Sequence, residues 1–175
     1  MDTSDSIPLE ETLEALGELV KQGKVRQIGL SNETPWGTMK YLELAETKSL
    51  PRVASIQNAY NLVNRGFEIG LSEVAMHEQV GLLAYSPLAQ GTLTGKYLGG
   101  QMPQGSRLAL FGDGPLMMRY KGDKTQQAIE MYVNLAKKYE IDPAQLAIQF
   151  CNIQPFVTST IIGATTMEQL KTCID

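Results

Sequence analysis

The sequence is poor in cysteine, has no excess of positive charge and contains no long hydrophobic run. Cys151 and Cys173 are too few for a disulfide framework, and neither stands at the CxxC or Cys/His spacing that binds zinc. We interpret both as buried or incidental thiols. Lysine and arginine number 15 against 19 aspartate and glutamate residues, and this net charge of −4 argues against nucleic acid or an anionic membrane surface as a partner.

The hydrophobic runs fall short of the roughly 18 residues that span a bilayer. The opening residues, MDTSDS, carry neither the basic nor the apolar region of a secretory signal. We therefore expect a cytoplasmic protein with no membrane segment. A chain of 175 residues with 43% hydrophobic content is long enough for one domain with a hydrophobic core, so residues 1–175 are expected to form a single domain.

Hydrophobic periodicity predicts strands that alternate with helices. Strands are expected at 25–30, 53–57, 80–85 and 158–162, and helices at 8–22, 35–47, 66–79, 125–139, 142–151 and after 166. Asp142 is expected to cap the helix that begins with Pro143. The candidate apolar positions of helix 35–47 are Trp36, Met39, Tyr41, Leu42 and Ala45. Apolar strands that alternate with helices are typical of a parallel sheet covered by helices. Two architectures fit this pattern: a doubly wound open sheet, and a piece of a closed (βα) barrel, of whose eight strands about four are present.

One segment stands outside this pattern. Between residues 99 and 124 glycine, proline, serine, glutamine and aspartate recur without any period, and so long a loop is usually functional or mobile. We predict a long mobile loop there. The only histidine, His77, falls within the expected helix 66–79, where a solvent-facing role is favoured over a catalytic one.

Polar and aromatic residues follow each expected strand. At the carboxyl ends of parallel strands, amide and hydroxyl groups can hydrogen-bond a carboxamide, and an aromatic ring can stack on a flat ring. The alternative is that serine and asparagine simply end strands and cap helices. The residues concerned are Ser31 and Asn32, Gln57 and Asn58, Tyr85 and Ser86, and Gly163, Ala164 and Thr165.

The segment QGTLTGKY (90–97) is only superficially similar to a Walker phosphate loop. Three residues separate Gly91 from Gly95 where four are required, and Tyr97 replaces the hydroxyl residue that holds magnesium. No GxGxxG motif follows an expected strand, which argues against a Rossmann site. Lys96 and Arg107 remain as candidate phosphate-binding charges, with solvated surface residues as the alternative.

Four segments carry a resemblance to a known family: GKVRQIGLSNE, IQNAYNLVNR, LLAYSPLAQGTLTGKYL and IIGATTMEQL, in this order. Together they resemble the C-terminal half of the aldo-keto reductase family, in the branch that includes bacterial reductases and the β-subunits of voltage-gated potassium channels. The resemblance covers nearly the whole chain. It implies the α/β fold class, as a parallel (βα) half-barrel with about four strands of a TIM-barrel-like fold.

The resemblance also implies NADP(H) as the cofactor. Residues that match Ser31, Asn32 and Gln57 hold the nicotinamide carboxamide in the family, and the residue that matches Tyr85 stacks on the nicotinamide. The loop 99–124 matches a flexible segment that folds over the dinucleotide. The remaining implied contacts are Ser86, Leu88, Ala89, Gln90 and Gly91 around the pyrophosphate, and Lys96, Arg107, Thr165 and Gln169 around the adenosine 2′-phosphate, with Gly163 at the last strand end.

The chain departs from the family in its catalytic residues. The family's catalytic tyrosine, lysine, aspartate and histidine stand on the first four strands and their loops, which match no part of this sequence. No catalytic residue is therefore assigned. Three residues could be considered as a substitute acid, namely Tyr60, Tyr85 and Glu33. None of them has a general base or a charged partner nearby in the sequence at the spacing of a known catalytic motif. Near the adenine, Thr172 and Cys173 replace a Glu-Asn pair common in relatives.

We accordingly expect an NADP(H)-binding half-barrel that is inactive alone in carbonyl reduction. One alternative is a non-catalytic dinucleotide-binding or assembly module, and another is a remnant that binds nothing. Half of a barrel leaves two sheet edges and an apolar interior uncovered, so we also expect a homodimer formed through these edges. The carbonyl substrate is not predicted, because the loops that select it belong to the family's first half.

Overall fold

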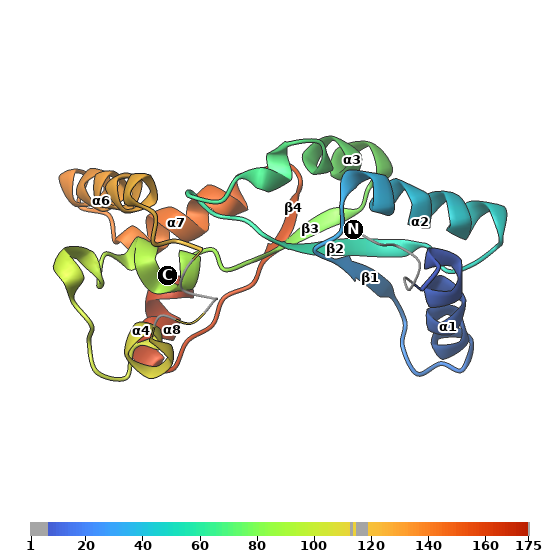
Figure 1. Cartoon of the computed structure of the whole chain (residues 1–175), viewed down its shortest axis with the longest axis horizontal. Coiled ribbons are helices and arrows are strands. Elements are labelled where there is room, and N and C mark those ends of the chain that lie inside the picture. Colours follow the sequence, from blue (N-terminus) through green and yellow to red (C-terminus); the bar gives the residue numbers. More distant parts are fainter. Residues whose placement is uncertain (1–6, 113, 115–118, 175) are drawn as a thin grey trace. The chain divides into compact units, whose positions relative to one another are not determined.

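The computed structural model describes residues 7–112, 114 and 119–174. Four parallel strands form one sheet in the order β1-β2-β3-β4, with flanking helices (Figure 1). This architecture confirms the expected α/β half-barrel class. The strands are β1 (Ile28–Ser31), β2 (Val53–Ala59), β3 (Gly81–Tyr85) and β4 (Val157–Thr160). The α-helices are α1 (Leu9–Lys21), α2 (Pro35–Thr47), α3 (Leu71–Glu78), α4 (Arg107–Phe111), α6 (Asp123–Lys138), α7 (Pro143–Asn152) and α8 (Met167–Ile174), and the 3₁₀ helices are η1 (Gly66–Glu68), η2 (Ala89–Thr94) and η3 (Leu98–Gly100).

The chain divides into two compact units. The first unit comprises the described residues up to Asn58, together with Glu68–Leu83. The second unit comprises Ala59–Phe67 and the described residues from Ala84 onward. Each unit is considered by itself, and a single domain over residues 1–175 stays a prediction.

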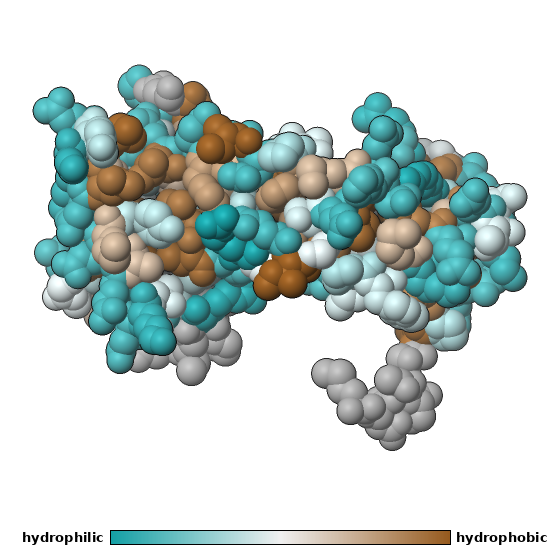
Figure 2. All heavy atoms as spheres, turned by 90° about the horizontal axis from the view of Figure 1, so that it is seen from above, coloured by the Kyte–Doolittle hydropathy of each residue, from teal (hydrophilic) through white to brown (hydrophobic). Residues whose placement is uncertain are grey.

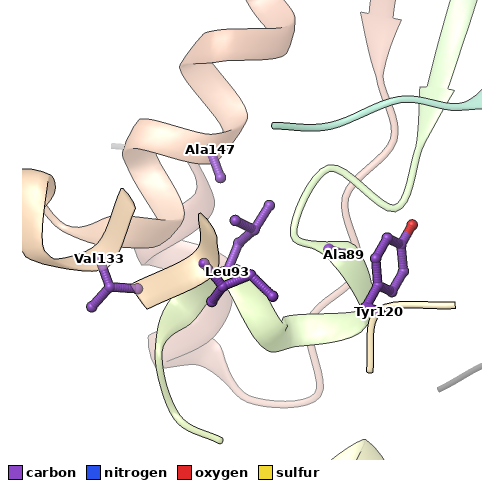
Figure 3. Packing of buried hydrophobic residues seen from close by; sticks show 6 residues of the cluster. Ala89, Leu93, Tyr120, Val133 and Ala147 are labelled. Atoms are coloured by element: carbon purple, nitrogen blue, oxygen red, sulfur yellow. The ribbon is translucent and has the colours of Figure 1, made fainter. Parts of the chain in front are cut away.

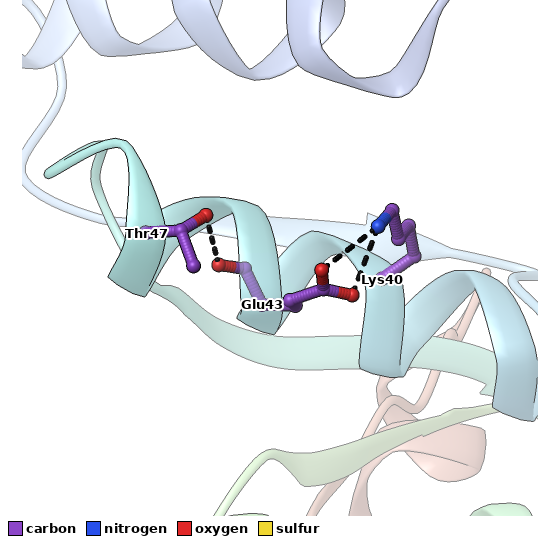
Figure 4. Close-up of polar contacts among 3 residues, drawn as sticks. All are labelled: Lys40, Glu43 and Thr47. Carbon is purple, nitrogen blue, oxygen red and sulfur yellow. Dashed lines mark hydrogen bonds and ion pairs between the residues drawn. The ribbon is translucent and has the colours of Figure 1, made fainter.

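In the first unit, α2 has the bounds that its sequence predicts. The Thr34 hydroxyl accepts a hydrogen bond from the backbone N–H of Gly37 at 3.1 Å, and a proline stands at the first helical position. On the exposed side, Lys40 donates to both carboxylate oxygens of Glu43, at 3.0 and 2.9 Å, and the Thr47 hydroxyl donates to the Glu43 carbonyl (Figure 4). Local capping thus defines where α2 begins, and the exposed ion pair adds little to stability.

The buried face of α2 differs in part from expectation. Tyr41, Leu42 and Ala45 are buried as predicted, but Trp36 is 72% exposed and Met39 is 42% exposed. The predicted burial of these two side chains was wrong. The reason is helical geometry, because positions 36 and 39 share the solvent face with Lys40 and Glu43, whereas 38, 41, 42 and 45 lie on the opposite face.

The predicted helix 66–79 is also wrong in its extent. Its first part is the short 3₁₀ helix η1, and the α-helix α3 begins only at Leu71. Gly70 separates the two with φ 88°, a conformation that interrupts an α-helix. Strand bounds shift less: β1 begins at Ile28 rather than at residue 25, and β2 continues to Ala59.

In the second unit, helices α6 and α7 build the core. Val133 and Ala147 are buried together with residues of η2, as Figure 3 shows, and Ile129 belongs to the same buried cluster. The predicted cap of α7 is confirmed, because the Asp142 carboxylate accepts from the backbone N–H groups of Ala144 and Gln145 at 2.7 and 3.4 Å. The full cluster is Ala89, Leu93, Tyr120, Ile129, Val133 and Ala147.

In the described part of the segment 99–124, an α-helix forms that the sequence did not predict. Helix α4 runs from Arg107 to Phe111, and the Ser106 hydroxyl caps it by accepting from the Ala109 N–H at 3.3 Å. Residues 113 and 115–118 of this segment lie outside the described residues. The mobility of the loop stays a prediction. Within the described part of the chain, no helix is both long and apolar enough to cross a membrane.

Candidate functional site

In the first unit, the structure brings together three predicted contacts at the ends of β1 and β2. Ser31 pairs with Gln57 in the parallel register, and the Asn32 N–H donates to the Gln57 carbonyl at 3.0 Å. The Asn32 carboxamide donates to the Ser31 hydroxyl at 3.1 Å. All three residues are exposed, and Asn32 has φ 54°. This pair of strand ends offers hydroxyl and amide groups to a polar ligand.

In the second unit, β3 ends in a turn that changes the direction of the backbone. Tyr85 is half-buried, and its carbonyl accepts from the Tyr60 N–H at 3.2 Å. Ser86 follows with φ 55°, in the left-handed region that side chains other than glycine seldom adopt. Residues other than glycine with this left-handed conformation occur often at ligand sites, where contacts with the surrounding structure maintain the conformation.

Leu88 leaves the left-handed region, with φ −90°, and the three residues after it return to that region. Ala89, Gln90 and Gly91 have φ 47°, 62° and 92°. A Cβ atom on Gly91 would lie 3.0 Å from Cε and 3.1 Å from Nζ of Lys96, so the absence of a side chain lets the lysine lie against this backbone. Within the turn, the N–H groups of Ala89 and Gly91 donate to the carbonyls of Ser86 and Leu88, at 2.9 and 2.8 Å, and these bonds hold the backbone in this conformation.

Two cations and two polar side chains surround this turn. The Arg107 guanidinium donates to the Gln90 carboxamide oxygen, and the Gln90 Nε2 donates to the Ser86 hydroxyl at 3.3 Å. The Lys96 ammonium stands 5.2 Å from the ring centroid of Tyr97. Arg107 is exposed and Lys96 is half-buried. Lys96 and Arg107 therefore place positive charge beside residues 86–91.

A third group of predicted contacts lies between β4 and α8. The backbone N–H and the hydroxyl of Thr165 both donate to the Gln169 carboxamide oxygen, each at 3.0 Å. Gly163 and Thr165 line a hollow of about 290 Å³. The whole lining is Ile162, Gly163, Ala164, Thr165, Thr166, Met167 and Leu170.

Comparison with known proteins agrees with the motifs and the fold. Residues 2–175 match the aldo/keto reductase family. The chain belongs to the aldo-keto reductase family. This membership confirms the resemblance, and the family is one of oxidoreductases.

The aldo-keto reductase relatives are about twice as long as this chain. The protein named "Protein tas" of Escherichia coli K12 is 52% identical over 174 residues, 99% of this chain and 49% of that protein. The "L-glyceraldehyde 3-phosphate reductase" of the same organism is 35% identical over 95% of this chain and 49% of its own length. A "Probable voltage-gated potassium channel subunit beta" of Oryza sativa subsp. japonica is 32% identical over 93% of this chain and 50% of its own length. The chain thus spans about half the length of the curated relatives it matches.

The structure restricts how two of the predicted residues of this aldo-keto reductase chain can act. Ala89 is fully buried, so its side chain belongs to the core and only its backbone can face a ligand. Leu88 is half-buried and packs against the same cluster. The Ala89 N–H donates to the Ser86 carbonyl at 2.9 Å, and the Ala89 carbonyl accepts from the Thr92 hydroxyl at 2.8 Å. The predicted place of both residues around the pyrophosphate stays a prediction.

The residues considered as substitute acids have other surroundings. Tyr60 is fully buried. One carboxylate oxygen of Glu33 accepts from the N–H and the hydroxyl of Thr34, at 2.7 and 3.2 Å, at the start of α2. His77 is exposed on α3, which confirms its expected solvent-facing position. Tyr60 thus has no surface that a ligand could reach, and Glu33 has a structural role at the start of α2.

Sequence reasoning missed three residues near the turn. Asn61 is buried and bonds the Ser86 carbonyl, and Tyr120 is buried against Asn61. Arg119 lies beside Tyr85, and hydrogen bonding to the Tyr85 side chain raises the pKa of its guanidinium. Asn61 stands in the motif IQNAYNLVNR, but only the buried position of this polar side chain, which a sequence does not reveal, shows its role.

Proposed function

We propose that this aldo-keto reductase chain binds NADP(H) and that the chain alone does not reduce carbonyl compounds. The observation that carries the proposal is the turn from residue 86 to 91. Its left-handed residues, the bare Cα of Gly91 and the adjacent cations Lys96 and Arg107 form a positively charged cradle that suits the phosphates of a dinucleotide. The residues present therefore fit the cofactor that the family uses.

Each group of residues would contribute a different contact. Ser31, Asn32 and Gln57 would hydrogen-bond the carboxamide of the nicotinamide, and the Tyr85 ring would stack on its flat face. The backbone from Ser86 to Gly91 would hold the pyrophosphate. When bound, the reduced nicotinamide supplies a hydride from its C4 atom.

The adenosine end would be held by the remaining group. The predicted contacts of the 2′-phosphate are Lys96, Arg107, Thr165 and Gln169. Two of these are cations, which would favour NADP(H) over NAD(H) by direct charge attraction to the additional phosphate. The Thr165 and Gln169 side chains would exchange their mutual hydrogen bonds for contacts with the ligand.

Catalysis requires more than this cradle. A carbonyl oxygen must receive a proton as the hydride arrives, and general acid catalysis contributes about a hundredfold to ten-thousandfold to such a step. The family residues that supply this proton are expected on strands that match no part of this sequence, so we assign the role to no residue of the chain. A longer protein or a second chain would have to supply it.

Calorimetric titration of the chain with NADPH tests the proposal. We expect dissociation constants in the micromolar range, with affinity about tenfold weaker in Lys96→Ala and in Tyr85→Ala. Lys137→Ala, which removes an exposed lysine from α6, is the matched control and should bind like the unchanged chain. Absence of heat with NADPH, or equal effects of all three substitutions, would contradict the proposal and favour the non-binding remnant.

A second candidate function is assembly. In the four-stranded sheet, β1 and β4 each have one neighbouring strand, so each leaves one side of its backbone without a strand partner in this sheet. Such edges pair with other strands. We propose that two copies of the chain associate through them.

A further inference from the structure

Asn61 has a polar side chain that has no exposed surface and makes three hydrogen bonds. Its Nδ2 group donates to the Ser86 carbonyl at 2.9 Å and to the Tyr120 hydroxyl at 3.1 Å. Its Oδ1 atom accepts from the Val63 N–H at 3.0 Å. The carboxamide thus uses both of its N–H groups and its oxygen. All four residues belong to the second unit.

The orientation of this carboxamide is fixed by its partners. A backbone N–H can only donate and a backbone carbonyl can only accept, so exchange of the Asn61 oxygen and nitrogen would set donor against donor and acceptor against acceptor. A buried amide with all its bonds satisfied has one arrangement. Asn61 is therefore a rigid link between Ser86 and Tyr120, which are distant in sequence.

The two residues that Asn61 connects belong to different parts of the predicted site. Ser86 begins the left-handed turn at φ 55° and has no intrinsic preference for that conformation. Tyr120 lies at the far end of the segment 99–124, is buried in the same cluster as Ala89 (Figure 3), and accepts through its carbonyl from the Gln126 side chain at 2.6 Å.

We propose that Asn61 is a positioning residue, whose carboxamide ties the Ser86 backbone to the Tyr120 hydroxyl and so holds the turn 86–91 in its ligand-binding conformation. This inference rests on the proposed function, because the ligand is NADP(H). A chain that leaves this conformation must reform it on binding, and its apparent affinity falls by the fraction of molecules that hold it. Asn61 and Tyr120 would thus control affinity without touching the nucleotide.

Two substitutions test the link. Tyr120→Phe removes one hydroxyl and keeps the buried ring, and Asn61→Ala removes all three bonds. We expect the dissociation constant for NADPH to rise about fivefold in Tyr120→Phe and more than tenfold in Asn61→Ala. Tyr139→Phe, the same change at an exposed tyrosine after α6, is the control and should leave the constant unchanged. A residue that served only overall stability would lower the unfolding temperature and leave the affinity of the folded molecules as it was.

Hydrogen exchange gives a second readout that needs no nucleotide. In the free chain, the backbone amides of residues 86–91 should exchange faster in Tyr120→Phe than in the unchanged chain, while those of α7 should not. Unaltered exchange at 86–91 overturns the inference whether or not NADPH binds. If the unchanged chain binds NADPH and Tyr120→Phe binds it equally well, the inference also fails while the proposed function stands. If the unchanged chain does not bind NADPH, the proposed function fails, and exchange alone decides the role of Asn61.

Discussion

At the scale of single residues, the thiol of Cys151 links burial to the pH dependence of stability. Cys151 has no exposed surface, and burial raises the pKa of its thiol from the ordinary 9.0 to about 12. The thiol stays protonated in the folded chain while the unfolded chain ionises. The contribution of Cys151 to the free energy of unfolding is therefore fully present below pH 9. It is lost as the pH rises toward 12, by up to about 1.4 kcal/mol per pH unit.

This behaviour predicts the outcome of one substitution. Cys151→Ala should make the free energy of unfolding fall less steeply above pH 9 than in the unchanged chain, as measured by urea unfolding at pH 8, 9 and 10. Cys173→Ala is the comparison, because burial raises the pKa of this half-buried thiol less strongly. Identical slopes for Cys151→Ala and the unchanged chain would show that Cys151 ionises as readily in the folded state as in the unfolded one.

At the scale of elements, Gly70 decides where α3 begins. Its φ of 88° lies in the left-handed region, and an added Cβ would lie 3.2 Å from Cγ of Pro35 at the start of α2. Gly70→Ala should therefore lower the free energy of unfolding by more than the roughly 1 kcal/mol that the backbone conformation alone costs. Chemical denaturation measures the change.

A second glycine isolates the contribution of this contact. Gly23 has φ 69°, and an added Cβ there would meet nothing within 4 Å. Gly23→Ala should therefore show the cost of the conformation without the contact with Pro35. If Gly70→Ala and Gly23→Ala lowered the free energy of unfolding equally, the close approach of Gly70 to Pro35 would contribute nothing to the effect.

These elements also show what a sequence can predict. The start of α2 follows from Thr34 and Pro35, and the start of α7 follows from Asp142 and Pro143. Both helix starts were predicted correctly. The break at Gly70 and the exposure of Trp36 depend on neighbouring elements, and both were predicted wrongly. Local signals define helix ends, whereas tertiary packing selects the buried face.

The site shows the same division. Ser31 and Tyr85 end β1 and β3 as predicted, whereas Gln57 and Asn58 lie within β2, which continues to Ala59. Asn61 bonds Ser86 and Tyr120, which lie 25 and 59 positions further along the sequence. No short motif encodes contacts over such separations. The use of the predicted site residues in binding NADP(H) stays a prediction until the titration is made.

At the scale of the whole molecule, the four-stranded sheet and the apolar surface predict association. Hydrophobic residues lie among hydrophilic ones on the face drawn in Figure 2, and Ile69 and Met167 are 82% and 77% exposed. Edge strands in natural proteins are commonly protected by charge, yet β4 reads VTST and has none. An uncharged edge strand favours pairing with a second copy.

Sedimentation equilibrium of the purified chain tests this association. We expect a mass that rises with concentration toward twice the 19.2 kDa of one chain. Thr158→Lys places a charge on the exposed edge of β4 and should weaken the dimer, whereas Asn134→Lys adds the same charge on the exposed face of α6 and should not. A mass of one chain at every concentration would exclude the dimer. Because a second copy repeats the residues of the first, we expect that dimer formation brings no reductase activity with it.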